Sequence, residues 1–292
     1  EAEVTATAGK ATPIEATLQR VLDTEGWIAG DFHIHAEHSV DSAVPNRQRL
    51  VDAAAAGIDY AVATDHDFVT DYAPFLQEAG LVGRLTVASG VEVSTVALGH
   101  HNIWPLSPQS DLPGNGAPEW FGKEPTALQT LLRGGDSKRV VQVNRPRGAQ
   151  SYFEGIGLGP QTDVAELAFD AMELLNGKRM GDTEKVLADW FALLARGLSV
   201  TVTANSDTHS LSAGTGGVRT YVWVGKDGAG KGRDVQGVFT AAQADEALRR
   251  GKAVASAGPL LTLELDAGCA KAGIGEGLVT AKAEMTVRAR LQ

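Results

Sequence analysis

The pattern of hydrophobic and polar positions changes period repeatedly from about residue 30 onward. Apolar runs with β-branched members predict strands, of which "IDYAVAT", "RVVQVN" and "SVTVTANSDTH" are the clearest. Segments with helical spacing lie between them, and two of these end at Gly57 and Gly197, a residue type that suits a helix C-terminus. Regular alternation of this kind is typical of βαβ units around a parallel sheet. We therefore predict an α/β fold.

The expected elements can be given by residue number. Strands are predicted over 32–34, 58–64, 84–90, 139–144, 171–177 and 199–209, and helices over 45–57, 127–135, 163–169, 182–197 and 240–252. The last helix begins with the capping-box spacing of Thr240 and Gln243.

Three segments differ in pattern and suggest the domain organisation. Residues 1–29 form a lead-in with a short helical pattern around Ile14 to Leu22. Residues 30–254 carry the alternation, and their length suits a single α/β barrel of about 250 residues. After them, "LLTLELDAG" and "AEMTVRARL" predict strands between Gly-rich turns, so we expect a small C-terminal β appendage over residues 255–292.

Composition narrows the functional classes. The 292 residues carry a formal net charge of -10 and no basic run, which argues against a groove for long nucleic acids. Cys269 is the sole cysteine, so an internal disulfide is excluded. No apolar run approaches the roughly 18 residues of a membrane span. Because numbering starts at Glu1, we expect a processed or truncated product; the compartment is open, and an extracytoplasmic location is compatible with this start.

Polar residues collect where the predicted strands end. This set comprises His33, His35, Asp65, His66, Glu92, Asn144, Glu173, Asp207 and His209. The carboxyl ends of barrel strands form one face, so these distant residues are expected to converge. His33 and His35 are two apart on a strand, which directs both rings to one side. Mixed imidazole and carboxylate ligands suit Zn²⁺, Mn²⁺ or Fe²⁺, so we favour a metal site over a solvated polar loop.

Other motifs and residues of the sequence give little support to a different chemistry. The sequence has neither H-E-x-x-H nor G-x-S-x-G, which leaves zincin and serine-hydrolase chemistry unsupported. The segment "GKDGAGKG" lacks the order of a phosphate-binding loop, and we expect a flexible loop there. His38 breaks the alternation of His33 and His35, and Cys269 lies in the appendage, so neither is expected to bind a metal.

Taken in order, several motifs resemble the PHP (polymerase and histidinol phosphatase) superfamily. They are "HIH" with the following "SVD", "ATDHD", "GVEVS", "GH" at 99–100, "ELLNG" and "NSDTHS". The segments "GHHN", "NRPRG", "DWFALLARG" and "ALRRGKAVASAGP" are similar to the branch that includes carbaryl hydrolases, the CehA/McbA type. An amidohydrolase also opens with H-x-H, but it would use a strand-end lysine and two later histidines where this chain has Glu92 and D-x-H.

The resemblance implies a distorted (β/α)7 PHP-type barrel with two or three divalent metal ions. It implies three metal sites, formed by His33, His35, Glu92 and Asp207, by Glu92 and His100, and by Asp41, His66 and His209. Relatives complete the second site with a histidine in an "NHPR" motif, where this chain has Arg145. His101 is the rival of His100 for this site, and the sequence leaves both open.

The resemblance also implies a metal-dependent hydrolase whose metal-activated hydroxide attacks phosphorus or a carbonyl carbon. Asp65 and Arg145 are the expected catalytic residues, Asp65 by orienting a ligand histidine or, equally, as a simple turn cap. Arg145, Arg147 and Asn176 are expected to bind a small anionic substrate; for the two arginines the alternative is plain surface charge. A phosphoesterase is the first reading, a carbamate, ester or amide hydrolase the second, and a non-catalytic metal-binding module the third. The oligomeric state is left open.

Overall fold

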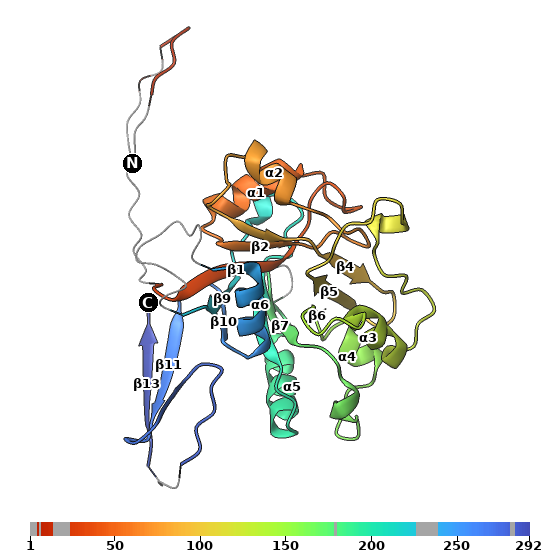
Figure 1. Ribbon diagram of the computed structural model, residues 1–292, viewed down its shortest axis with the longest axis vertical. Helices are drawn as coiled ribbons and strands as arrows, with labels where there is room; N and C mark the ends of the chain where they lie inside the picture. The colour runs from red at the N-terminus through yellow and green to blue at the C-terminus, as the bar shows by residue number, and fades with distance from the viewer. Residues whose placement is uncertain (1–4, 6, 14–23, 178–179, 226–238, 281–283) are drawn as a thin grey trace.

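Two five-stranded sheets with helices on their outer sides form the body of the protein, and a third, three-stranded sheet stands at one end (Figure 1). The computed structural model describes residues 5, 7–13, 24–177, 180–225, 239–280 and 284–292. The expected helix around Ile14 to Leu22 and most of the expected loop at 225–232 lie outside the described residues.

The first sheet has the order β10-β9-β1-β2-β3 and the second the order β4-β5-β6-β7-β8. Their strands are β1 (Trp27–Ile34), β2 (Tyr60–Ala63), β3 (Thr86–Ala88), β4 (Val91–Ser94), β5 (His100–Trp104), β6 (Val140–Asn144), β7 (Ala171–Asn176), β8 (Thr201–Asn205), β9 (Arg219–Trp223) and β10 (Ala253–Ser256). The helices are α1 (Asn46–Ala55), α2 (Ala73–Glu78), α3 (Pro125–Arg133), α4 (Tyr152–Gly155), α5 (Thr183–Ala195) and α6 (Ala241–Arg249), with single 3-10 turns at Pro113–Asn115, Val164–Glu166 and Leu211–Ala213. Among the described helices, none combines the length and apolar composition that a bilayer crossing requires.

The expected closed barrel is not formed by the described strands. The two sheets meet through isolated bridges, Ile34 with Thr208 and His66 with Glu92. Strands β1 and β8 are not paired by a backbone ladder. A side chain connects them instead, since the Phe32 amide donates to Asn205 Oδ1 at 2.9 Å. Strands β5 and β9 also run antiparallel to their neighbours, which departs from a repeated βα unit. The architecture is therefore mixed α/β, with two open sheets that meet at the carboxyl ends of β1 and β2.

Gly90 allows the chain to cross from the first sheet to the second between β3 and β4. A Cβ atom at this position would lie 2.8 Å from the carbonyl oxygens of Ala63 and Ile103. A side chain cannot be accommodated at that distance, so the crossing requires glycine. As a result Glu92 lies within a separate strand, β4, and not just past the strand predicted over 84–90.

The helix expected over 163–169 is wrong. Only a 3-10 turn forms there, capped by Asp163, whose carboxylate accepts from the Ala165 amide at 2.9 Å. Beyond the turn, Leu167 is extended, and both it and Phe169 are buried in the core beside β6 and β7. Burial of two residues at alternate positions outweighs the helical spacing of this short segment. The predicted capping box of α6 is confirmed, with Thr240 and Gln243 bonded in both directions.

The third sheet has the order β12-β11-β13 and comprises β11 (Leu261–Asp266), β12 (Lys271–Gly273) and β13 (Thr286–Leu291). Just before it, β10 pairs with β9 and so belongs to the first sheet. The domain boundaries expected at residues 29 and 254 stay a prediction.

Asp245 in α6 is a buried carboxyl within the core that joins α6 to the first sheet. Its Oδ1 accepts from Tyr60 Oη at 3.0 Å and from Trp104 Nε1 at 2.8 Å. Burial raises the pKa of Asp245 from 3.8 to about 6, although both hydrogen bonds lower it. Folding therefore favours the protonated form, and stability should fall as the pH rises from about 4 through about 6.

We expect Asp245→Asn to stabilise the protein at pH 8 by up to about 3 kcal/mol, since a pKa shift of one unit is worth about 1.4 kcal/mol. The amide keeps the Oδ1 acceptor but carries no charge. The advantage should shrink towards zero near pH 4, where the wild-type carboxyl is protonated in both states. Thermal unfolding of both proteins across this range is the measurement. An Asn variant that is destabilised equally at every pH would contradict the expectation.

Candidate metal centre

Glu92 lies at the centre of a buried cluster of histidines and carboxylates where the two sheets meet. Its Oε1 is 3.1 Å from His33 Nε2 and 3.2 Å from His100 Nδ1. Its Oε2 is 2.9 Å from His66 Nδ1 and 3.6 Å from His35 Nε2. A carboxylate with imidazoles at both oxygens would be able to contribute ligand oxygens to more than one of the candidate groups.

His33 in β1 and His35, the residue that follows this strand, lie on the same side, as the two-residue spacing predicts. Their ring centroids are 5.0 Å apart and both side chains are fully buried. Their Nε2 atoms lie 3.3 and 3.4 Å from the same oxygen, Asp207 Oδ1. Asp207 follows β8 with a left-handed φ of 50°, held by its amide, which donates to the His33 carbonyl at 2.9 Å. The hydrogen bond between the segment after β8 and β1 thus holds Asp207 in place beside His33 and His35.

Asp41, His66 and His209 form an outer group next to this cluster. Asp41 Oδ2 lies 2.9 Å from His209 Nε2 and 3.6 Å from His66 Nε2. Its side chain is 48% exposed, so the group opens to solvent. The His209 ring stacks on His35 with centroids 4.0 Å apart, which connects the outer group to the buried cluster.

Each ligand histidine has its Nδ1 side held by a neighbouring group or by Glu92 itself. His33 Nδ1 lies 2.7 Å from Glu173 Oε1, His35 Nδ1 lies 2.8 Å from Ser39 Oγ, and His209 Nδ1 lies 2.9 Å from the Asp207 carbonyl. For His33 and His209, the carboxylate or carbonyl partner favours the proton on Nδ1 and leaves Nε2 available as a ligand atom. His66 and His100 instead turn Nδ1 towards Glu92, so Nδ1 is their candidate ligand atom.

Three buried polar atoms at the centre of the cluster are not satisfied by hydrogen bonds. Among the described residues, His33 Nε2, His35 Nε2 and Glu92 Oε2 form ion-pair contacts of 2.9–3.6 Å but no hydrogen bond of acceptable geometry. Buried polar atoms are normally satisfied, so such a set facing one centre fits metal ligation. Three groups have ligand atoms within 4.8 Å of one another, namely His35, Asp41, His66 and His209; His33, His35 and Glu92; and His66, Glu92 and His100. The residues present therefore fit one or more divalent ions.

The charges of the cluster also favour a cation. Burial alone lowers the pKa of His33, but the carboxylates around it outweigh burial and hold this pKa well above its usual value. Burial raises the pKa of Glu92, yet the adjoining histidines bring it well below its usual value, so the carboxylate stays ionised. Burial lowers the pKa of His35 to about 4, which keeps this imidazole neutral and able to ligate at neutral pH.

Arg145 reaches into the cluster from the end of β6. Its Nη2 lies 2.5 Å from His100 Nδ1 and 3.6 Å from Glu92 Oε1, and its Nη1 lies 3.8 Å from Asp207 Oδ2. Its backbone has a left-handed φ of 43°, and its amide donates to Glu173 Oε2 at 3.0 Å. The guanidinium thus stands beside His100, where the resemblance places the second metal.

The structure separates the two candidate histidines of β5. His100 faces Glu92, whereas His101 is fully buried on the opposite side and packs edge-on against Tyr152 at 4.9 Å. Burial lowers the pKa of His101 to about 3. His38 stacks on Phe68 outside the three ligand groups, and Cys269 is exposed in the third sheet.

Of the other predicted residues, one lies against the cluster and two do not. Asn176 Nδ2 donates to Glu173 Oε2 and to Asp207 Oδ2, both at 3.1 Å. Asp65 accepts from the Ala36 amide at 2.6 Å and from Thr70 Oγ1 at 2.5 Å, which is the bonding of a turn cap. Arg147 turns away to Asp189, with Nε 2.6 Å from Oδ2.

Sequence reasoning assigned no role to Glu173 or Asn144, although both were among the strand-end residues. Glu173 is buried and holds the imidazole of His33, the amide of Arg145 and the side chain of Asn176. Asn144 Nδ2 donates to Glu92 Oε1 at 2.8 Å. The signal that could have found them is their position alone, since Asn144 ends β6 and Glu173 lies inside β7.

Comparison with solved structures identifies the fold. A two-domain protein from Bacteroides vulgatus that contains a predicted PHP-like metal-dependent phosphoesterase aligns with a TM-score of 0.53 and 18% identity, over 84% of this chain and 69% of that one. A putative metal-dependent phosphoesterase from Bifidobacterium adolescentis aligns with a TM-score of 0.43 and 15% identity over 64% and 90% of the two chains. An amidohydrolase from Chromobacterium violaceum with bound sulfate and no metal also gives 0.43 and 15%, over 77% and 97%.

No protein-family model matches the chain, and no curated protein is similar to it in sequence. The first of the three structural likenesses places the chain among proteins with a PHP-like fold.

Proposed function

We propose that this chain is a metal-dependent hydrolase of the PHP type that acts on phosphoesters. One observation carries the proposal: the buried Glu92 carboxylate has four imidazole nitrogens within 3.6 Å, while its Oε2 and the Nε2 atoms of His33 and His35 lack hydrogen-bond partners among the described residues. The PHP-like fold and its neighbour, which contains a predicted metal-dependent phosphoesterase, support the same reading.

The residues would hold two or three ions, Zn²⁺, Mn²⁺ or Fe²⁺, at the three groups described above. When bound, such an ion supplies Lewis-acid polarisation of the substrate and lowers the pKa of water to about 7. Glu173 keeps the Nδ1 proton of His33 in place, so that Nε2 stays available as a ligand. Asn176 and Asn144 orient Asp207 and Glu92 in the same way by donating to their carboxylates.

Arg145 is the residue proposed to bind the substrate. Burial alone lowers its pKa, but the carboxylates around it outweigh burial and raise it further, so the guanidinium stays charged at every accessible pH. A cavity of about 110 Å³ lies beside it, lined by His100, Asn144, Arg145, Ala149 and Gln150. A planar cation at a small cavity suits a phosphate group of a small anionic substrate. Arg147 is occupied by Asp189 and is given no part in this proposal.

The competing function is hydrolysis of carbamates or esters, which membership of the CehA/McbA branch would favour. The test below distinguishes it from phosphoester hydrolysis. The identity of the metal belongs to the proposal as well.

The test measures hydrolysis of p-nitrophenyl phosphate, bis-p-nitrophenyl phosphate and naphthyl carbamates by protein loaded with Zn²⁺ or Mn²⁺. We expect phosphoester turnover that is lost after chelation with EDTA and restored by metal. The melting temperature should fall on chelation, because an ion that binds only the folded state stabilises it by mass action. Preferential carbamate turnover would favour the carbamate or ester hydrolase activity of the CehA/McbA branch over a phosphoesterase. Unchanged activity and melting temperature after proven removal of metal would overturn the metal-dependent mechanism.

A further inference from the structure

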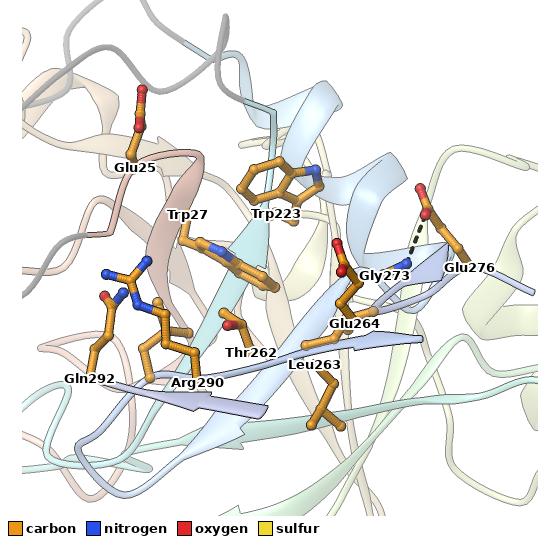
Figure 2. A pocket seen from close by; sticks show the side chains of 12 residues that line it. Glu25, Trp27, Trp223, Thr262, Leu263, Glu264, Gly273, Glu276, Arg290 and Gln292 are labelled. Carbon is orange, nitrogen blue, oxygen red and sulfur yellow. Dashed lines mark hydrogen bonds between the residues drawn. The ribbon is translucent and has the colours of Figure 1, made fainter. Parts of the chain in front are cut away.

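A second cavity, of about 530 Å³, lies between the first sheet and the C-terminal sheet (Figure 2). Trp27 begins β1 and Trp223 ends β9, so the cavity is at the opposite end of β1 from His33 and His35. Six to eight strand residues separate the two places, or roughly 20–26 Å at about 3.3 Å per residue. The cavity is therefore distinct from the metal centre.

The C-terminal sheet turns its polar face to this cavity and its apolar face outward. Pairing of Thr262 with Arg290 and of Leu261 with Leu291 puts each pair on one face. Leu261 and Leu291 are 40% and 70% exposed. Figure 2 shows Thr262, Glu264 and Arg290 directed towards Trp27, while Leu263 points away from it. A sheet that packed on the body merely to bury apolar surface would have the opposite orientation.

Two indole rings form the apolar wall of the cavity. The centroids of Trp27 and Trp223 are 5.3 Å apart, with 58° between the ring planes. Gly26, with φ of 86°, permits this corner, because a Cβ there would come within 2.1 Å of the Trp223 ring. The rings offer flat apolar surface at one side of a polar cavity.

We propose that this cavity binds a neutral saccharide of one to three sugar units. Sugar hydroxyls both donate and accept hydrogen bonds, and the wall offers both kinds of partner. The Thr262 hydroxyl can donate and accept, and the carboxylates of Glu264 and Glu276 keep acceptor capacity beside the hydrogen bonds that they already accept. The C–H faces of a sugar ring suit the indole surfaces.

The charges and size of the cavity argue against other ligands. Lys271 and Arg288 pair with Glu264, and Lys252 pairs with Glu276, so these cations are already engaged by carboxylates of the wall and are poorly placed to bind phosphate. A quaternary ammonium would suit the indoles, but it would form no hydrogen bond with the Thr262 hydroxyl and would fill little of a cavity of about 530 Å³. Both remain outcomes of the test.

The test titrates the full chain, in EDTA and separately with Zn²⁺, with glucose, cellobiose, maltotriose, xylotriose and chitobiose. Choline and inorganic phosphate are the competing probes. Calorimetry and tryptophan fluorescence report binding. We expect at least one saccharide to bind with a Kd of about 1 mM or tighter, equally with and without metal.

Two variants and their matched controls locate the site. Trp223→Leu should weaken binding about tenfold or more, and Thr262→Val about threefold, because each removes one wall contact. Phe121→Leu changes an aromatic residue that is 88% exposed and outside the cavity, and Thr286→Val changes a threonine on the same sheet face that does not line it; neither should alter Kd. If Trp223→Leu fails to fold, Thr262→Val still tests whether the saccharide binds in this cavity. The proposal is overturned if no saccharide binds up to about 10 mM, if the cavity variants bind as the wild type does, or if choline or phosphate binds there instead.

Discussion

Glu92→Gln is expected to remove bound metal from the buried cluster and to lower kcat/KM for a phosphoester by about a thousandfold, or about 4 kcal/mol of transition-state stabilisation. Glu92 contacts His33, His35, His66 and His100 through its two oxygens. The amide has one weak acceptor in place of an ionised carboxylate, so it cannot serve two ions, and it places an N–H donor where a ligand atom is needed.

Metal analysis of the purified protein and steady-state kinetics measure both effects. Glu78→Gln is the matched control, since Glu78 is exposed on α2 and lies outside all three ligand groups. The control should retain wild-type metal content and kcat/KM. If Glu92→Gln kept its metal and lost less than about tenfold in kcat/KM, Glu92 would not be the central ligand.

Arg145→His is expected to raise the metal content by about one ion per chain at saturating Zn²⁺ or Mn²⁺. A guanidinium cannot ligate a metal and repels one nearby, and here it lies 2.5 Å from His100 Nδ1. An imidazole at the same position would join His100 and Glu92 and complete a ligand set for a second ion. The left-handed backbone at position 145 is compatible with histidine, which adopts positive φ more readily than most residues.

Arg147→His is the control for this change, because Arg147 is two residues away and pairs with Asp189. Its metal content should equal that of the wild type. Arg145→Gln is a third variant, which removes the charge without supplying an imidazole. It should raise KM for an anionic substrate and leave the metal content unchanged. Equal metal content in Arg145→His and wild type would show that position 145 does not control the second site.

Several features of the candidate site were accessible before any tertiary structure. The H-x-H spacing predicts that His33 and His35 face one side, because neighbouring side chains alternate along a strand. The predicted strand-end positions of Glu92, Asp207 and His209 indicate convergence, and the structure brings all three to the cluster, although Glu92 lies within β4. The helices over α1, α3, α5 and α6 were likewise predicted, since each has helical spacing and a glycine or capping signal at an end.

Other features depended on contacts between distant segments. The closed barrel was expected from the order of strands and helices, but whether two strands form a ladder depends on register and on side chains such as Asn205, which takes the Phe32 amide. The helix expected over 163–169 failed for a similar reason, because burial of Leu167 and Phe169 beside distant strands decided the backbone.

The sequence by itself determined which residue types could form a metal centre and on which side of their own strands they lie, because both follow from local chemistry and a two-residue period. Only the tertiary structure shows that His100, and not His101, faces Glu92, since either face of β5 could have met Glu92 until β5 was paired between β4 and β6. It also decided that Arg145 enters the cluster while Arg147 leaves it, and that the C-terminal sheet turns its polar face inward. Each of these depends on the direction in which one element meets another, and that direction is set by packing between residues far apart in the chain.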